Sequence, residues 1–449
     1  MTTQPRQHER NKTMTTTKLS MNRRNWLRLL GASAAALPML STPAWAAGAM
    51  AGGNHCLILI ELEGGNDGLN TLIPFRDDNY HRARPTLALS GSDVLGLNSE
   101  SGLHPSLGGL AKAWERGDLR LIEGVGYPDP NRSHFRSIEI WNAGLGAQSN
   151  DTQGWISRLM NGADGVQALD TDGIRLGGEM GPLRGPGRFT GLEEIEGFFE
   201  QTDALRAAGV LGEYDDATTG NTMNAGGMAG LMDTSNRAHA VRPAGGNAAL
   251  DHVLSVHSNA LGTADLLERK IRASAQRDFN MPDSLLGLQL TVALQLLDAG
   301  VTTPVFKVSH GGFDTHANQE EEHAFLLLEL DEALAGFERA ARDMGLWDQV
   351  TLMTYSEFGR RFYENGSAGT DHGTAAPVIL AGGAVRGGLG GQRPSLEARD
   401  LVDRDMVHTT DFRSVYAGLA RDLWGLDPTR AVGGLGADGA AFSPVRILG

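Results

Sequence analysis

Two short motifs carry the residue types that bind divalent metals in proteins. "FDTH" contains Asp314 and His316, and "TDHG" contains Asp371 and His372. An aspartate and a histidine separated by one residue lie on the same side of an extended segment, so both can reach one ion. Imidazole nitrogens and carboxylate oxygens suit a divalent ion such as Zn²⁺, Mg²⁺, Mn²⁺ or Ca²⁺. Each pair taken alone is also compatible with an ordinary polar turn.

Further acidic and hydroxyl groups occur in similar positions, each just after an apolar run. They are Asp67, Ser133 and Glu357. Asp67 between glycines is also typical of a turn, and Ser133 before a helical pattern is also typical of an N-cap. Glu357 could simply pair with a nearby arginine on a solvated loop. A metal or substrate site is therefore indicated by the whole set rather than by any one member.

The apolar runs that precede these groups predict buried strands. They cover residues 56–62, 119–126, 305–308, 350–355 and 377–383. Helical patterns alternate with them: 283–300 is apolar on nearly all sides, and 327–344 repeats apolar residues at spacings of three and four. This alternation predicts an α/β fold with a mostly parallel central sheet and helices on both faces.

Parallel sheets bring the carboxyl ends of their strands to one edge, where ligand sites form. The polar clusters around Asp67, Ser133, Asp314, Glu357 and His372 all follow predicted strands. We therefore expect side chains that are far apart in sequence to gather along that edge.

Composition excludes several classes of protein. The formal charge of -15 argues against a nucleic-acid-binding protein, because phosphate backbones recruit dense Lys/Arg patches. The single cysteine, Cys56, excludes internal disulfides and cysteine-based zinc sites, and its apolar surroundings predict a buried, inert thiol. Glycine is abundant, at 60 of 449 residues, so many turns are expected. Residues 212–248 show no periodicity and predict a long loop or insertion.

The first 46 residues have the features of an export signal. Arg23 and Arg24 precede a short apolar run, and the segment ends in the small-x-small sequence Ala44-Trp45-Ala46. The apolar run is shorter than the roughly 20 residues that a membrane-spanning helix needs. The arginine pair resembles a twin-arginine (Tat) signal. We therefore expect the Tat export machinery to be a partner of the chain and cleavage to follow residue 46. The product would be periplasmic or otherwise exported, without a membrane anchor, and would form a single domain over residues 47–449.

Four motifs together resemble a known family. "ELEGGNDGLNTLIP", "PNRSHFRSIEIW", "GGFDTHANQ" and "SEFGRR…ENGSAGTDHG" are similar to the bacterial, largely Tat-exported domain of unknown function 1501, over about residues 55–425. That family in turn resembles a distant branch of the alkaline phosphatase and sulfatase superfamily. The resemblance implies an alkaline-phosphatase-like fold and a site for two divalent metals.

The resemblance also implies roles for individual residues. Ser133 corresponds to the nucleophile. Independently of the resemblance, the nearby side chains of Arg132, Arg136, Arg360 and Arg361 suit an anionic substrate, and Arg132 or Arg136 would bind its anionic group. The ligands of one metal would be Asp67, Asp371 and His372, and those of the other Asp314, His316 and His408. Glu357 could be an additional ligand or could instead hold one of the ligands in position from behind. The Asp314-x-His316 spacing is shorter than usual for the superfamily, so His310 is an alternative to His316.

These inferences lead to one functional hypothesis and one alternative. The chain is expected to be an exported hydrolase of phosphate or related anionic esters that uses Ser133 and one or two divalent metal ions. The lack of a Cys-x-Pro-x-Arg motif disfavours a formylglycine sulfatase. The alternative is a non-catalytic periplasmic binding or assembly protein that keeps the same fold.

Overall fold

The computed structural model describes residues 55–208, 210–211, 248–275, 277–433 and 442–449. These residues all belong to one compact unit, Pro43–Gly449. The predicted signal segment 1–46 and almost all of the predicted insertion 212–248 lie outside the described residues.

The centre of the fold is a nine-stranded sheet among the described residues. Its order is β13 (Gly388–Gly391), β5 (Leu119–Gly126), β12 (Ala376–Ala381), β9 (Val350–Tyr355), β1 (Cys56–Leu62), β8 (Val305–His310), β6 (Gly173–Arg175) and β7 (Phe189–Gly191), with β14 (Thr410–Asp411) beside β5. β12 pairs antiparallel with both of its neighbours, and the other pairings are parallel. The predicted strand 377–383 is therefore present but runs opposite to the rest.

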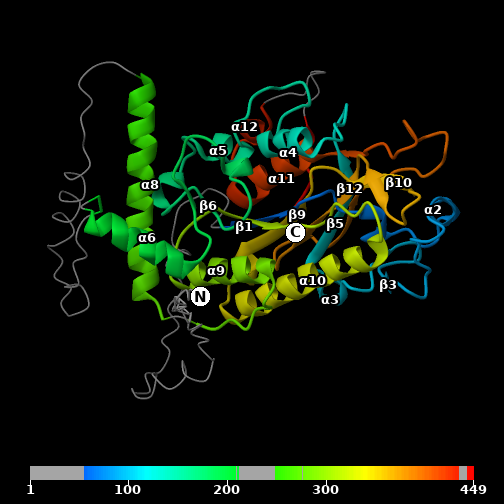
Figure 1. The fold of residues 1–449 in the computed structure, drawn as a ribbon, viewed down its shortest axis with the longest axis horizontal. Coiled ribbons are helices and arrows are strands. Elements are labelled where there is room, and N and C mark those ends of the chain that lie inside the picture. Colours follow the sequence, from blue (N-terminus) through cyan, green and yellow to red (C-terminus); the bar gives the residue numbers. More distant parts are fainter. Residues whose placement is uncertain (1–54, 209, 212–247, 276, 434–441) are drawn as a thin grey trace, which may run out of the picture. The chain divides into compact units, whose positions relative to one another are not determined.

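Helices pack on both faces of this sheet (Figure 1). One face carries α3 (Gly108–Arg116), α6 (Ile195–Ala207), α8 (Ala248–Ala273), α9 (Leu285–Asp298) and α10 (Gln319–Asp343). The other carries α4 (His134–Ala143), α5 (Trp155–Met160), α11 (Phe412–Trp424) and α12 (Pro428–Val432). The α/β class with a mostly parallel sheet between two helical layers is thus confirmed.

The alternation of side chains along β1 explains its uninterrupted apolar sequence. Ile58 and Ile60 pack into the core on the α9 and α10 side, whereas Leu57 and Leu59 pack into the core on the α11 side. Successive strand residues point to opposite faces, and a strand covered on both faces buries all of them. Cys56 is buried at the start of the strand, where burial raises the pKa of its thiol.

Smaller elements surround the sheet. A hairpin joins β10 (Arg360–Glu364) to β11 (Thr370–His372), and a second small sheet has the order β2 (Leu72–Ile73), β4 (Gly102–Leu103), β3 (Leu95–Gly96). The remaining helices are α2 (Asp78–Ala83) and the 3₁₀ turns η2 (Gly68–Asn70), η3 (Val166–Ala168), η4 (Gly181–Leu183) and η6 (Trp347–Gln349). The β10–β11 hairpin matters most, because it carries residues of the candidate site.

The two helices predicted in the second half of the chain are present. Ser284 caps α9 by accepting a hydrogen bond from the Gly287 amide, as its position predicts. Complete burial of α9 is wrong for its first turn, where Leu285 and Leu288 are 70% and 55% exposed. Among the described residues, no helix is both long and apolar enough to cross a membrane.

Candidate metal centre

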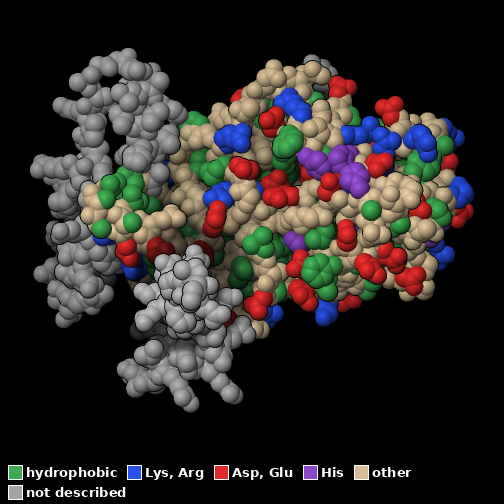
Figure 2. Space-filling model, in the orientation of Figure 1, with side chains coloured by type: hydrophobic (Ala, Val, Ile, Leu, Met, Phe, Trp, Pro, Cys, Tyr) green, Lys and Arg blue, Asp and Glu red, His purple; other side chains and the backbone are tan. Residues whose placement is uncertain are grey.

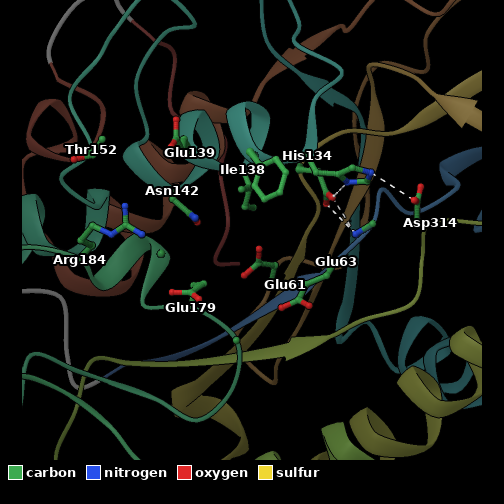
Figure 3. Close-up of a pocket in the computed structure, with 15 residues that line it drawn as sticks. Glu61, Glu63, His134, Ile138, Glu139, Asn142, Thr152, Glu179, Arg184 and Asp314 are labelled. Atoms are coloured by element: carbon green, nitrogen blue, oxygen red, sulfur yellow. Dashed lines mark hydrogen bonds and ion pairs between the residues drawn. The ribbon is translucent and has the colours of Figure 1, made fainter.

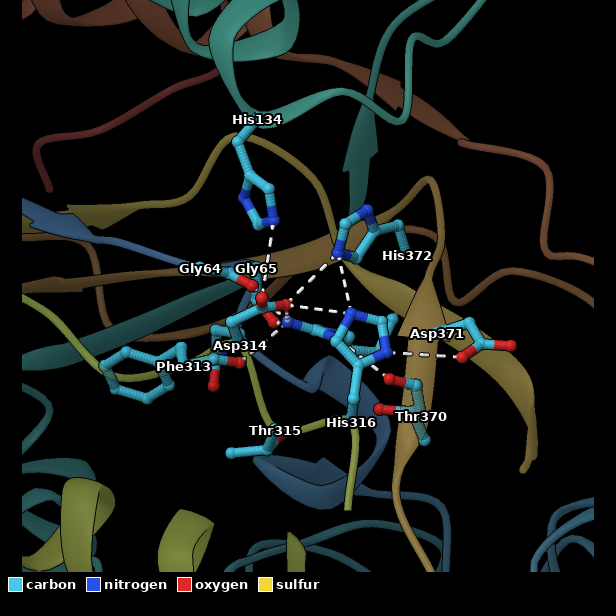
Figure 4. Close-up of polar contacts among 12 residues, drawn as sticks. Gly64, Gly65, His134, Phe313, Asp314, Thr315, His316, Thr370, Asp371 and His372 are labelled. Atoms are coloured by element: carbon cyan, nitrogen blue, oxygen red, sulfur yellow. Dashed lines mark hydrogen bonds and ion pairs between the residues drawn. The ribbon is translucent and has the colours of Figure 1, made fainter. Parts of the chain in front are cut away.

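Side chains from three separate segments meet beyond the carboxyl ends of the parallel strands. His134 is the first residue of α4, Asp314 follows β8, and His372 ends β11. One ligand atom from each of these three residues lies within 4.8 Å of the other two. Figure 4 shows the three rings of His134, His316 and His372 turned toward the Asp314 carboxylate, and Figure 2 shows histidine side chains gathered at one place on this face.

His316 completes the group. Its Nε2 atom lies 3.0 Å from Asp314 Oδ1 and 2.9 Å from His372 Nε2. Thr315 between the two predicted ligands is buried, so Asp314 and His316 both turn outward from the same segment, as their spacing predicts. We call His134, Asp314, His316 and His372 the metal-centre cluster.

Hydrogen bonds at the far side of two rings set their orientation. His372 Nδ1 lies 2.8 Å from the carbonyl oxygen of Arg132, and His316 Nδ1 lies 3.2 Å from Asp371 Oδ1. Both partners are acceptors, so each Nδ1 carries the proton. The two Nε2 atoms then point lone pairs toward the centre of the cluster.

The third ring is held in the same way by Glu357. His134 Nδ1 lies 2.6 Å from Glu357 Oε1, and Nε2 lies 3.6 Å from Asp314 Oδ2. Glu357 is 4% exposed and also accepts hydrogen bonds from the Gly64 amide and the Ser356 hydroxyl. A carboxylate behind a histidine is the usual outer partner of a metal ligand. Glu357 therefore orients His134 and does not itself join the metal-centre cluster.

The chemistry of this donor set fits a divalent ion. The Nε2 atoms of His316 and His372 lie 2.9 Å apart, and their lone pairs repel each other unless a proton or a metal cation lies between them. A tetrahedral ion with bonds of about 2.0–2.1 Å places its ligand atoms about 3.3 Å apart. The three Nε2 atoms lie 3.0 to 3.6 Å from the oxygens of Asp314, and the Nε2 atoms of His316 and His372 lie 2.9 Å apart, which is close to this spacing.

Asp314 also forms an ion pair with an arginine of the β10–β11 hairpin. The guanidinium of Arg360 lies 2.6 Å from Asp314 Oδ1 and also donates to the Phe313 carbonyl oxygen. Burial raises the pKa of Asp314, but hydrogen bonds from Arg360 and His372 outweigh burial, and the pKa lies below its ordinary value. The carboxylate is therefore ionised at neutral pH, as a metal ligand must be.

A glycine pair allows the loops of the site to approach each other. Gly64 has φ +116°, and a Cβ atom there would lie 2.4 Å from the Asp314 amide nitrogen. Gly65 has φ +84° and lies against the Phe358 ring. Only glycine combines these conformations with such close contacts. The "EGGNDG" motif thus provides the packing that positions Asp314.

Asp67 lies in a different environment from the one predicted. It is 1% exposed and forms a 2.5 Å ion pair with Arg84, whose side chain is also fully buried. Its carboxylate further accepts from the Leu69 amide and from the Gln319 side chain. Burial raises the pKa of Asp67, but Arg84 outweighs it and lowers the pKa. The structure therefore gives Asp67 the role of a buried ion-pair partner, outside the metal-centre cluster.

The predicted histidine alternatives also lie outside the metal-centre cluster. His408 packs its Cβ beside Gly126, and burial lowers its pKa. His310 is buried, and its Nε2 lies 2.9 Å from the carbonyl oxygen of Leu326. Neither belongs to the His/Asp/His group found among the described residues.

The predicted nucleophile lies next to the cluster. Ser133 is exposed at the N-cap of α4, and its side chain makes no capping hydrogen bond. It is flanked by Arg132, whose carbonyl oxygen holds His372, and by His134. Ser133 is thus placed at a helix N-terminus, where negative charge is favoured.

The two arginines predicted to bind an anion are held by other groups. Arg132 pairs with Asp405 at 3.1 Å, and Arg136 pairs with Glu139 and donates to the carbonyl oxygens of Ala147 and Ser149. Arg361 differs from them, because within the described residues it forms no ion pair. Its Nε lies 3.4 Å from the carbonyl oxygen of His372. Arg361 is therefore a cation beside the site that remains available for an anion.

A pocket of about 730 Å³ opens beside the metal-centre cluster. His134 and Asp314 line one end, and Arg184 and Thr152 lie at the opposite end (Figure 3); Glu357, the hydrogen-bond partner of His134, also lines the pocket. The pocket connects the site to a volume large enough for part of a substrate.

Sequence reasoning did not assign their present roles to two residues of this site. His134 was not predicted as a metal ligand, although its position at the start of a helix after a strand offered a signal. The role of Arg360 is not visible in the sequence, because it depends on the return of the β10–β11 hairpin to the loops at Gly64 and Phe313.

Fold and site together define an α/β protein with a candidate divalent-metal centre at the carboxyl edge of its sheet. Residues 99–435 match the family described as "Protein of unknown function (DUF1501)", and the chain belongs to this family. The family predicted from the four motifs is thus confirmed. No curated protein matches the chain.

Several solved structures are similar to the chain at low sequence identity. One is a protein of the alkaline phosphatase superfamily from Vibrio parahaemolyticus, with 12% identity over 86% of this chain and 71% of that chain and a TM-score of 0.37. A phosphonate monoester hydrolase of Agrobacterium radiobacter has 10% identity, coverage of 86% and 79%, and a TM-score of 0.36. The C-terminal periplasmic domain of EcEptC from Escherichia coli, in a complex with Zn, has 11% identity, coverage of 88% and 90%, and a TM-score of 0.35. These similarities concern the fold.

Proposed function

We propose that the chain is an exported, metal-dependent hydrolase of phosphate or related anionic esters. The observation that carries the proposal is the convergence of three histidine Nε2 atoms on the Asp314 carboxylate, each ring held from behind by an acceptor. Such oriented, converging lone pairs are a feature of metal sites rather than of polar turns.

The donor set also favours one kind of metal. Imidazole suits Zn²⁺ and its transition-metal neighbours, whereas Mg²⁺ and Ca²⁺ prefer oxygen ligands. His134, Asp314, His316 and His372 would hold one such ion. When bound, the ion would supply Lewis-acid polarisation of the ester and would offset charge that develops during its cleavage.

The protein's own groups would then perform the remaining tasks. Ser133, at the N-terminus of α4, is our proposed nucleophile, because its hydroxyl is exposed and lacks a capping role. Arg361 would bind the anionic group of the ester, since within the described residues it has no carboxylate partner. Arg132 keeps a positioning role, because its backbone oxygen holds the His372 ring.

The test is hydrolysis of a panel of aryl phosphate, phosphonate and sulfate esters by the Zn²⁺-loaded protein. We expect turnover of at least one member, with loss of about 10³-fold or more in His372→Ala and in Ser133→Ala. Ser133→Ala should keep the bound metal with all of its ligands, whereas His372→Ala should bind the metal more weakly and with one imidazole fewer. Metal-loaded wild-type protein without turnover of any ester would favour the non-catalytic alternative instead.

A further inference from the structure

The pocket beside the metal-centre cluster is unusual in its charge. Six carboxylates line it, and Arg184 is the one arginine or lysine among its lining residues in the described chain. The carboxylates are Glu61, Glu63, Glu139, Glu179, Asp314 and Glu357. Such a lining attracts positive charge and repels a second anionic group.

Some of this negative charge is already balanced. Lys307 lies 2.6 Å from Glu61, Arg136 pairs with Glu139, and Arg360 pairs with Asp314. In contrast, the side chains of Glu63 and Glu179 make no hydrogen bond or ion pair with any residue that the structure describes. Arg184, whose side chain likewise has no ion-pair partner among the described residues, offsets one of these two charges, so the pocket retains net negative charge away from the metal-centre cluster.

Glu61 adds a buried acceptor to the pocket. It is 7% exposed, and its Oε2 receives both the Lys307 ammonium and the Tyr355 hydroxyl. Its other oxygen, Oε1, accepts no hydrogen bond from the described residues, although Glu61 lines the pocket. This oxygen is not among the buried atoms without a partner in the described residues, so it is open to the pocket and can accept a hydrogen bond from a ligand or from water.

The neighbouring loop is shaped around Glu63. Gly178 has φ +63°, and a Cβ atom there would lie 2.8 Å from Glu63 Oε1 and 2.6 Å from Lys307 Nζ. Glu63 is consequently half-buried between the loop and the end of β1. Partial burial strengthens the attraction between its charge and a bound cation.

Apolar side chains of α4 also line the pocket, together with Glu139 and Asn142 of the same helix. Phe135 is 84% exposed and Ile138 is half-buried, both on α4 and both lining the pocket. An exposed aromatic ring in a pocket that is also lined by carboxylates favours ammonium groups, because the ring face attracts cations and accommodates their methyl or methylene groups.

We propose that this pocket binds the alcohol portion of the substrate ester and selects an alcohol that carries a positively charged ammonium group. This proposal rests on the proposed function, since it places the scissile ester at the metal-centre cluster and the leaving alcohol in the adjacent pocket. The cleavage itself adds water across the ester, so that the ammonium alcohol leaves with a proton and the anionic group is released.

Two alcohols of equal shape test the selection without requiring turnover. Choline and 3,3-dimethylbutan-1-ol differ only in a positively charged nitrogen in place of a carbon atom. We expect calorimetry on the Zn²⁺-loaded protein to show choline binding about tenfold tighter or more. Equal affinity for the two alcohols, or tighter binding of glycerol than of choline, would overturn the proposal.

Matched variants locate the effect. Glu63→Gln keeps the shape of the side chain and removes its charge, and it should reduce the preference for choline by about fivefold. Glu115→Gln removes the same charge from an exposed position of α3 outside the pocket, and the preference should be unchanged. A preference that survives Glu63→Gln and Glu179→Gln together would contradict the assignment of these carboxylates.

The outcome separates this proposal from the proposed function. If the protein binds choline but hydrolyses neither choline phosphate, choline sulfate nor any aryl ester, the result would support the ammonium subsite and contradict the proposed hydrolase activity. If the protein hydrolyses aryl esters but has equal kcat/KM for choline phosphate and 3,3-dimethylbutyl phosphate, the result would support the hydrolase activity and contradict the ammonium subsite.

Discussion

Two aspartates that follow strands of the same parallel sheet have opposite environments in this protein. Asp67 comes after β1 and is fully buried against Arg84. Asp314 comes after β8, and its side chain is 48% exposed and faced by three histidine rings. The first forms a closed ion pair, and the second has the open, multi-donor surroundings of a ligand.

The difference shows what a position at the end of a strand does and does not determine. Topology brings both carboxylates to the same edge of the sheet. Their chemistry is then decided by partners from other segments: Arg84, just after α2, for Asp67, and the β10–β11 hairpin and α4 for Asp314. An acidic residue after a strand therefore predicts location better than it predicts function.

The largest expected effect comes from breaking the buried pair. Arg84→Met leaves the Asp67 carboxylate buried without its cation, which should cost about 3–5 kcal/mol of unfolding free energy. Urea denaturation of metal-free protein measures this. As the control, Asp314→Asn should change the stability of metal-free protein by less than about 1 kcal/mol, because Asp314 is half-exposed. Equal destabilisation by both variants would remove the contrast between the two regions.

Acid should also destabilise the buried surroundings of Asp67. Burial lowers the pKa of His104 and of His323 to about 4, and both rings lie near Asp67. In the unfolded chain, a histidine has a pKa of about 6.5. Above that pH the two histidines contribute fully to stability, and their contribution is lost as the pH falls toward 4, because they bind protons in the unfolded chain before they do so in the folded protein. The expected loss is up to about 3 kcal/mol for each histidine.

This pH effect is measured as the unfolding free energy of metal-free protein between pH 7 and pH 4.5. His323→Gln keeps a donor for Asn66 Oδ1, the present partner of the ring, and should flatten the dependence in that window. A slope unchanged by His323→Gln would assign the acid sensitivity to other groups.

A smaller effect is expected where an outer partner of the metal-centre cluster is changed. Glu357→Gln weakens the hold on the His134 ring, and it should lower Zn²⁺ affinity about 10- to 100-fold with little change in fold. Competition with a chelating dye gives this affinity. Glu115→Gln serves as the control with the same change of charge on an exposed helix. If both variants bind Zn²⁺ as the wild type does, Glu357 does not position a ligand.

The smallest effect is expected for Asp371→Asn. Asp371 touches His316 Nδ1 at 3.2 Å, and its side chain is 55% exposed. A hydrogen bond from Asn365 lowers its pKa, although burial opposes this, and the carboxylate is partly screened by solvent. We therefore expect a loss of Zn²⁺ affinity of less than about tenfold. A loss greater than that of Glu357→Gln would show that Asp371 is itself a ligand.

The sequence predicts most of the fold because the strands are continuous apolar runs with glycine-rich ends. β1 and β9 have the residues that their sequences predict, and so does the buried face of α10 at Leu327, Leu330 and Leu334. The reversed direction of β12 was not predictable, since an apolar run has the same pattern in either orientation.

The site could be predicted only in part for a similar reason. Spacing alone places Asp314 and His316 on one side of a segment, and the structure shows them together. The separation of Asp67 from the metal-centre cluster depends on Arg84, which no local pattern connects to it. The contribution of His134 depends on how α4 is rotated, and Glu357 sets the position of its ring.

X-ray absorption spectroscopy of the Zn²⁺-loaded protein tests the central claim most directly. The account predicts about one ion per chain with three imidazole ligands and at least one oxygen, and loss of one imidazole in His372→Ala. No stoichiometric metal, or a bound ion whose imidazole count does not change in His372→Ala, would contradict it.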